Sequence, residues 1–147
     1  FDQVIVREKQ LATSIGAFVE EARGPGLIQA IATVAPGKSP ADVEAAIYEE
    51  IEKVKAAPVA DWEMEKARNS ARRAAATTVL STLQRAVQLG QDALFYNDPN
   101  RMNTIAERTQ KVTAADVQRV AVKYLTKENR SVVITVPKPA AAKGDRP

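Results

Sequence analysis

The feature that most constrains this chain is a pair of apolar, β-branched segments at residues 13–20 and 27–34. Between them lie residues 22–26, which include two glycines and a proline. Two strand-like segments joined by a short segment rich in Gly and Pro predict an antiparallel β-hairpin. A lone hairpin is only marginally stable in water, so the rest of the chain must supply elements that cover it.

Gly16 stands inside the first of these two segments. Side chains alternate between the faces of a strand, which puts Thr13 and Ile15 on one face and Gly16 and Phe18 on the other. Because glycine has no side chain, Gly16 leaves room for another backbone or a ligand to approach closely. The apolar residues on both faces of residues 27–34 predict an inner strand with helices packed on it.

Helical spacing of apolar side chains dominates the middle of the chain. Capping residues predict four helices, which begin at Ser39, near Asp61, near Asp98 and at Thr113. The first is expected to end before Pro58, and the second to continue past a bend near Thr78 to a C-terminal cap at Gly90. Residues 94–96 are expected to form an apolar turn.

Residues 131–136 are β-branched almost throughout and predict a last strand that joins the hairpin. The predicted fold class is therefore α+β, with an antiparallel-rich sheet and helices packed on one face. We expect one domain over residues 1–137 and a disordered tail over residues 138–147. Since Phe1 falls inside an element, the upstream part of the domain is expected to be missing.

The chain contains no Cys and no His. Without His, a Ser-His-Asp triad and a His-containing zinc site are both impossible. The sequence thus predicts that this segment holds no catalytic centre and no metal of its own, and the lack of Cys leaves the cellular compartment open.

The charged residues are interspersed, and the net charge is +3. The densest basic group consists of Lys66, Arg68, Arg72 and Arg73, with no aromatic residue among them. It is interpreted as a solvated helix face, which argues against nucleic-acid binding.

Three glutamates are likewise expected on the solvent-exposed side of a helix, namely Glu49, Glu50 and Glu52. Trp62 is interpreted as a packing residue. No apolar run is long enough to span a membrane.

Five segments occur in an order that resembles one protein family. They are residues 36–40, 62–69, 112–117, 121–125 and 129–133, which read PGKSP, WEMEKARN, VTAADV, AVKYL and NRSVV. This order is similar to that in the insulinase and mitochondrial-processing-peptidase family of zinc peptidases, the inverzincins. The resemblance covers roughly residues 4–138.

The resemblance implies a protein built from repeated α+β domains. In such a protein, zinc binds to an H-x-x-E-H motif of the catalytic domain. Because this chain has no His, it resembles the later part of a non-zinc-binding, inactive domain. Zinc is then expected in a partner domain or subunit of the same family. The implied role is to help enclose and bind a peptide substrate, in a possible homo- or heterodimer.

The resemblance also implies a substrate-binding segment. In the family, a segment reading Arg-x-x-x-x-Leu-x-Tyr ends a helix and starts the hairpin, and its Arg and Tyr contact the substrate backbone. Here Arg7 lies one residue closer to Leu11, and Thr13 stands at the Tyr position. Arg7 and Thr13 are the candidate substrate-binding residues, and the alternative for Arg7 is a solvated helix end.

Two hypotheses follow for the function. The first is a non-catalytic domain of a zinc metallopeptidase that binds peptide. The second is a structural or assembly module of the same fold without a proteolytic role, which the altered Arg and Tyr positions favour.

Overall fold

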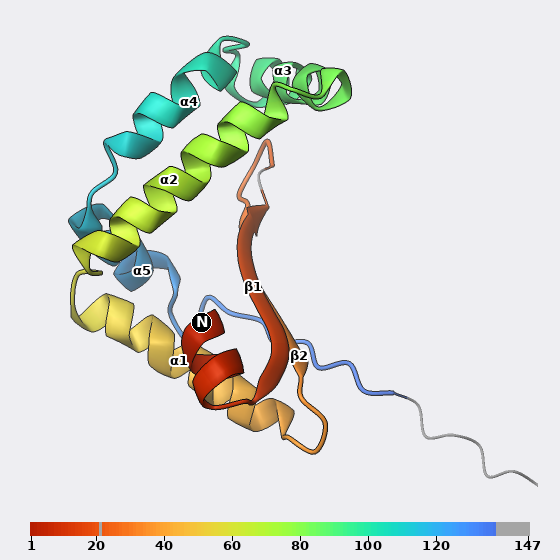
Figure 1. Cartoon of the computed structure of the whole chain (residues 1–147), viewed down its shortest axis with the longest axis vertical. Coiled ribbons are helices and arrows are strands. Elements are labelled where there is room, and N and C mark those ends of the chain that lie inside the picture. Colours follow the sequence, from red (N-terminus) through yellow and green to blue (C-terminus); the bar gives the residue numbers. More distant parts are fainter. Residues whose placement is uncertain (21, 138–147) are drawn as a thin grey trace, which may run out of the picture.

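A computed structural model describes residues 1–20 and 22–137, and Figure 1 shows its arrangement. In chain order the elements are the π-helix η1 (Asp2–Glu8), β1 (Ala12–Glu20), β2 (Leu27–Val34), α1 (Pro40–Ala56), α2 (Asp61–Thr78), α3 (Thr82–Tyr96), α4 (Arg101–Gln110) and α5 (Ala114–Tyr124). The predicted α+β class is confirmed. The expected tail at residues 138–147 lies outside the described residues.

The hairpin forms as the sequence predicts. β1 and β2 pair antiparallel, with Gly16 opposite Ile31 and Phe18 opposite Gln29. The register is interrupted once, between Ala12 and Ser14, by a β-bulge.

The predicted third strand at residues 131–136 is absent from the sheet, which has only β1 and β2 among the described residues. Val133 is 89% exposed, and residues 131–137 make no backbone hydrogen bond within the described chain. A β-branched composition favours an extended backbone, but a strand also needs a sheet edge whose N–H and C=O groups it can reach. Residues 131–136 pair with neither of the free edges of β1 and β2 in the described chain.

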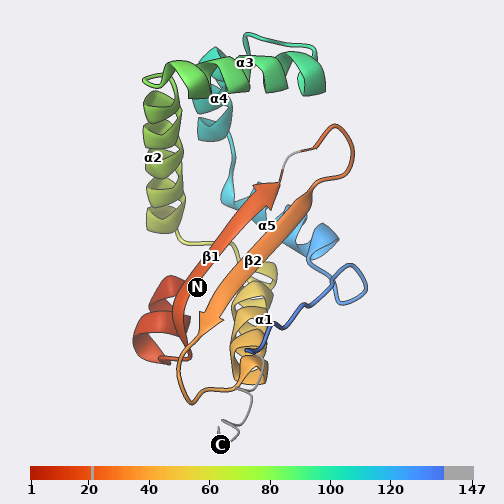
Figure 2. The same cartoon turned by 90° about the vertical axis from the view of Figure 1, so that its right-hand side faces the viewer.

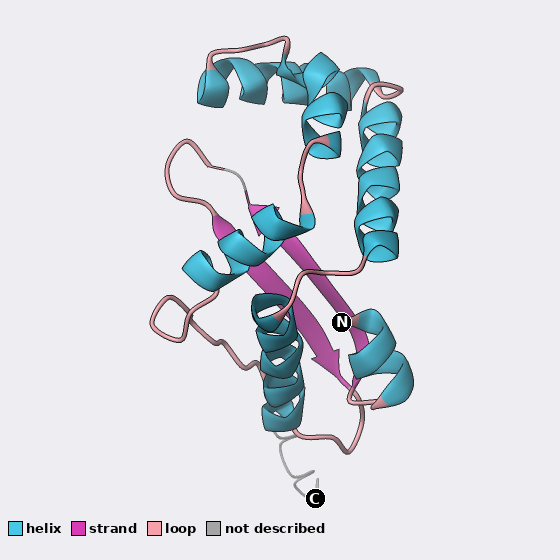
Figure 3. Ribbon diagram, turned by 90° about the vertical axis from the view of Figure 1, so that its left-hand side faces the viewer, coloured by secondary structure: helices cyan, strands magenta, loops and turns pink. Residues whose placement is uncertain are grey.

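The core lies between the sheet and the helices beside it. Figure 3 shows η1, α1 and α5 on one face of the sheet. The fully buried cluster joins η1, β1 and α1 and consists of Ile5, Ala12, Val43 and Ala46. The predicted helix start at Ser39 is confirmed, because its hydroxyl oxygen accepts a hydrogen bond from the Ala41 N–H at 3.2 Å.

Among the described residues, no helix lies on the opposite face of the sheet. Figure 2 views the sheet from this open side. The helices therefore pack on one face of the sheet, as expected. The expectation of an inner position for the second strand is wrong, because β2 pairs only with β1 among the described residues. The helices that remain, α2, α3 and α4, pack on one another at one end of the molecule (Figures 1 and 2).

The helix breaks differ in part from the prediction. The bend expected near Thr78 is a true break, after which Ser81 caps α3 by accepting from the Gln84 N–H at 3.3 Å. Gly90 does not end a helix, since α3 continues through residues 94–96 to Asn97. Asn97 adopts the left-handed conformation with φ of 52°, which Asn tolerates better than most residues.

Two of the predicted surface arginines have partners in another part of the chain. Arg68 Nη2 donates to the Val112 carbonyl oxygen at 2.6 Å, and Arg72 Nη2 donates to Gln110 Oε1 at 2.8 Å. Val112 lies just beyond the C-terminal end of α4, and Gln110 is the last residue of that helix. The negative end of the helix dipole lies there, so it attracts a guanidinium group. Arg68 is partly buried, so the prediction of a solvated helix face is wrong for this residue, whereas Arg72 remains exposed.

Candidate substrate-binding segment

The segment between η1 and β1 departs from regular backbone geometry at three places. η1 is a π-helix, in which the Lys9 N–H donates to the Val4 carbonyl oxygen at 2.8 Å. Gln10 follows with a positive φ of 50°, and Thr13 is the extra residue of the β-bulge. π-helical turns, bulges and strained residues are frequent at functional sites.

Arg7 lies in the last turn of η1. Its Nε donates to Asp2 Oδ2 at 2.9 Å, and its side chain is 70% exposed. The π-helix brings residues five apart onto one face, as the Gln3–Glu8 hydrogen bond at 3.1 Å also shows. An arginine has five N–H donors, so most donors of Arg7 still point to the surface.

Thr13 lies at the start of β1, beyond the Gln10 turn. Its hydroxyl donates to the Thr33 carbonyl oxygen on β2 at 3.3 Å, and its side chain is exposed. The structure therefore places Arg7 and Thr13 at the two ends of one short segment, with no hydrogen bond between them.

An ion pair ties this segment to α1. Lys9 Nζ lies 2.5 Å from Glu49 Oε2, and this hydrogen bond holds the pKa of the Glu49 carboxyl below its ordinary value. The two neighbouring carboxylates on α1 pair with lysines of the same helix, Glu50 with Lys53 and Glu52 with Lys55. These three glutamates thus form separate ion pairs. Glu49 and Glu52 face solvent as expected, whereas the side chain of Glu50 is only 17% exposed.

The residues present do not fit a catalytic zinc. The whole chain lacks His, and the described residues contain no group of three or more His, Cys, Asp or Glu side chains that could hold a metal ion. Among the described residues, no helix combines the length and the apolar character needed to cross a membrane.

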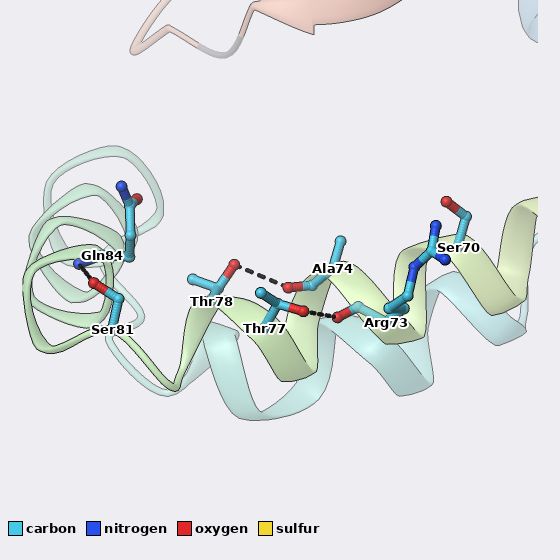
Figure 4. Close-up of a pocket in the computed structure, with 7 residues that line it drawn as sticks. All are labelled: Ser70, Arg73, Ala74, Thr77, Thr78, Ser81 and Gln84. Atoms are coloured by element: carbon cyan, nitrogen blue, oxygen red, sulfur yellow. Dashed lines mark hydrogen bonds between the residues drawn. The ribbon is translucent and has the colours of Figure 1, made fainter.

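Two shallow hollows lie elsewhere on the helices. The one in Figure 4 has a volume of about 440 Å³ and is lined by Ser70, Arg73, Ala74, Thr77, Thr78, Ser81 and Gln84. The hydroxyls of its two threonines donate to carbonyls of their own helix, at 2.8 and 3.0 Å. A second hollow of about 510 Å³ lies between the end of α1 and α5 and is mainly apolar. Neither includes Arg7 or Thr13.

The open sheet face is a candidate surface that the sequence only partly indicated. Phe18, Leu27 and Ile31 are 48%, 61% and 57% exposed on the side away from the helices. The sequence signal for it was Gly16, which lies among them. Nothing comes within 4 Å of a Cβ placed on Gly16, so the space beside it is empty of protein atoms.

The burial of two side chains differs from what the sequence indicated. Trp62 is 64% exposed at the start of α2, so the packing role predicted for it is wrong. Asp92 on α3 is fully buried, where its Oδ1 accepts from Gln88 Nε2 at 3.1 Å and lies 3.9 Å from Arg101 Nη1 of α4. No sequence pattern marks Asp92 as a buried residue, and its burial follows only from the packing of α3 on α4.

Comparisons with known proteins agree with this architecture. Residues 3–71 match the family described as peptidase M16 inactive domain. No curated protein matches the chain by sequence.

Three solved structures share the fold. A domain described as the inactive peptidase domain of a protein assigned as a zinc protease from Bordetella parapertussis is 26% identical, with a TM-score of 0.75 over 92% of this chain and 73% of its own. A protein assigned as a zinc protease from Bordetella pertussis Tohama I is 25% identical, with a TM-score of 0.75 over 88% of this chain and 71% of its own. A protease from Helicobacter pylori is 19% identical and has a TM-score of 0.76 over 86% of this chain.

This chain spans only 30% of the length of the Helicobacter pylori protease. The family match includes the segment from η1 through α1 that carries Arg7 and Thr13, and the shared fold extends over the helices that follow. Residues 3–71 thus resemble a peptidase M16 inactive domain, and the chain as a whole has the fold of the inactive peptidase domain of a protein assigned as a zinc protease.

Proposed function

We propose that this chain is a non-catalytic domain that helps enclose and bind a peptide substrate of a zinc metallopeptidase. The observation that carries the proposal is the irregular segment from Arg7 to Thr13, which presents an exposed guanidinium beside the start of an open sheet. In this proposal the zinc site lies in a catalytic domain or subunit of the same family.

The chemistry of Arg7 suits a peptide. A guanidinium donates to peptide carbonyls, and it binds a terminal carboxylate with two parallel hydrogen bonds. Asp2 occupies only the Nε position of Arg7, which leaves the terminal nitrogens directed to solvent. Thr13 presents a hydroxyl that already donates to Thr33 and can still accept from a peptide N–H.

The exposed area supports a role inside a larger assembly. The chain has an accessible surface of 11350 Å², whereas a compact monomer of 15.9 kDa would expose about 7,000 Å². Large apolar side chains are exposed on the sheet, on α3 and along residues 132–136. A catalytic partner domain, in the same chain or in a homo- or heterodimer, would cover part of this surface.

A second candidate function is a structural or assembly module of the same fold with no proteolytic role. The observation in its favour is the departure at the two substrate-contacting positions, where Thr13 replaces a Tyr and Arg7 is shifted by one residue. A chelator separates the two candidates, because chelator-sensitive cleavage by the parent complex excludes a purely structural role.

The first test changes Arg7→Ala in the complete protein together with its catalytic partner. Losing a hydrogen bond from a charged group is expected to lower kcat/KM for a peptide by about tenfold or more, mainly through KM. Steady-state cleavage of a fluorogenic peptide measures it. The stability of the variant should change by less than about 1 kcal/mol, because the Arg7–Asp2 pair is exposed.

The matched control is Lys111→Ala, which removes a similarly exposed cation from an ion pair with Glu107 at 2.8 Å. This control should leave kcat/KM unchanged. Equal kinetics for the Arg7 and Lys111 variants would leave Arg7 as a solvated helix end and remove the main support for peptide binding.

A further inference from the structure

The two sides of α3 face opposite to what their chemistry favours. Asp92 is fully buried against α4, where Arg101 Nη1 lies 3.9 Å from its Oδ1. On the other side of the helix, Leu83, Val87 and Leu94 are 70%, 45% and 68% exposed. An amphipathic helix at a protein surface normally turns its apolar stripe towards the core. The apolar side of α3 instead remains uncovered by the described residues, at one end of the molecule (Figures 1 and 2).

The buried side of α3 holds the helix only weakly. Gln88 Nε2 donates to Asp92 Oδ1 at 3.1 Å, but Asp92 Oδ2 has no hydrogen-bond partner among the described residues. A carboxylate oxygen that is removed from water without a partner costs free energy. Burial of the opposite, apolar side against a partner would offset that cost.

The exposed side of α3 has the spacing of a helix–helix contact. Four residues form this side, hereafter the α3 stripe, and they follow one another at intervals of four, three and four: Leu83, Val87, Gly90 and Leu94. This is the 3.5-residue period of the a and d positions of a coiled coil. Successive helical turns are about 5.4 Å apart, whereas side chains on one face of an extended peptide repeat at about 6.6 Å. The α3 stripe thus matches a second helix better than an extended peptide.

We propose that the α3 stripe docks an α-helix of the catalytic partner, and that this helix presents an uncharged apolar stripe of its own. The proposal rests on the proposed function and adds the element through which the partner is held. Leu83, Val87 and Leu94 each have apolar surface left to bury against such a helix.

The residues within and beside the stripe favour a close, uncharged contact. Nothing comes within 4 Å of a Cβ placed on Gly90, so a neighbouring backbone can approach there. The flanking positions, at which coiled coils place ion pairs, all have uncharged side chains: Gln84, Ala86, Gln91 and Ala93. The docked helix is therefore selected by apolar burial and not by opposite charge.

The area of the α3 stripe favours a partner domain over a second copy of the chain. Its three large side chains expose a few hundred Å² together. A stable interface between two free proteins buries about 800 Å² on each side. Two copies joined only through α3 would fall short of this area, whereas a partner domain that also covers the hairpin face adds α3 to a larger interface.

Single cysteines test the proposal cleanly because the chain has no Cys of its own. Leu83→Cys, Val87→Cys and Leu94→Cys each place one thiol on the α3 stripe. The matched control is Arg85→Cys, which lies on the opposite side of the same helix and is also exposed. All four changes replace exposed residues, so the fold should be kept.

The measurement is the rate at which each thiol reacts with a maleimide in the complete protein with its catalytic partner, followed by mass spectrometry of the labelled peptide. Each rate is compared with that of the same variant in denaturing urea. We expect the three stripe thiols to be slowed at least about tenfold more than the Arg85→Cys thiol. Added salt should leave this difference unchanged, because the contact is uncharged.

Equal slowing at all four positions, or at none, would overturn the proposal. A disulfide-linked dimer of the Val87→Cys chain would overturn it in favour of a second copy. If the stripe thiols stay reactive while cleavage remains sensitive to a chelator and to Arg7→Ala, the docking helix is wrong and the proposed function stands. If they are slowed but no chelator-sensitive cleavage occurs, the proposed function fails and the docked helix does not belong to a catalytic partner.

Discussion

Arg7 and Arg68 both lie on helices, yet their guanidinium groups have different surroundings. Arg7 is 70% exposed and pairs with Asp2 of the same helix. Arg68 is half-buried and donates across to the Val112 carbonyl oxygen, which follows α4 in the chain. The first guanidinium is available to a ligand, whereas the second holds α2 against the end of α4.

Replacing Arg68→Ala should lower the free energy of unfolding by about 1–3 kcal/mol, since it leaves a carbonyl without its charged donor and removes packed side-chain atoms. Urea denaturation followed by circular dichroism measures the loss. Arg68→Lys should recover part of it. Lys66→Ala, an exposed change two residues away on α2, should stay within about 0.5 kcal/mol of the parent, and an equal loss in both variants would contradict the role given to Arg68.

At the scale of elements, the start of α5 is fixed by a reciprocal cap. Asp116 Oδ2 accepts from the Thr113 hydroxyl at 2.7 Å and from the Thr113 N–H at 3.1 Å, and the Thr113 hydroxyl oxygen accepts from the Asp116 N–H at 3.2 Å. Arg119 Nη2 adds a bond at 3.1 Å to Oδ1. The hydrogen bonds from Thr113, followed by the one from Arg119, lower the pKa of Asp116 from 3.8 to about 2.

This shift predicts the pH dependence of the cap. Because the pKa is lower in the folded state, the cap contributes its stability above about pH 4 and loses it as the pH falls towards 2. Thermal unfolding between pH 6 and 2 should show that loss in the parent and a shallower decline in Asp116→Asn. Ser39→Ala, which removes the cap of α1, should lower stability equally across this range since serine does not titrate. A parallel decline in parent and Asp116→Asn would disprove the assignment.

At the scale of the whole molecule, the elements fall into two packed groups. η1, both strands, α1 and α5 surround the core of Ile5, Ala12, Val43 and Ala46, while α2, α3 and α4 pack on one another (Figures 1 and 3). In the second group Met64 and Asp92 are the buried side chains. The open hairpin face and the exposed side of α3 leave apolar surface for a partner domain.

The two groups should differ in local stability. Amide hydrogens of α1 around Val43 and Ala46 are expected to exchange more slowly than those of α3, because few buried contacts hold α3 in place. Hydrogen exchange followed by mass spectrometry measures this on the complete protein. Addition of the catalytic partner should slow hydrogen exchange in the element that the partner covers, either the hairpin or α3. Uniform protection along the chain without the partner would contradict the division into two groups.

The sequence by itself determined the parts that depend on near neighbours. The hairpin between residues 13 and 34 and the helix starts at Ser39 and Thr113 rest on turn geometry and on capping bonds spanning two or three residues. The order of short motifs also identified the family that residues 3–71 match. The hairpin and the helix starts can be predicted because the side chains that cause them lie next in sequence to the backbone groups with which they form hydrogen bonds.

Only the tertiary structure decided the rest. Residues 131–136 have the composition of a strand and remain unpaired, Arg68 finds a carbonyl far along the chain, and the helix end predicted at Gly90 moves to Asn97. The π-helix and the bulge around the candidate segment, and the bare sheet face at Gly16, likewise depend on how the elements pack. Strand pairing, burial and ion pairing each need a partner that is distant in sequence, and local composition contains no information about where that partner lies in space.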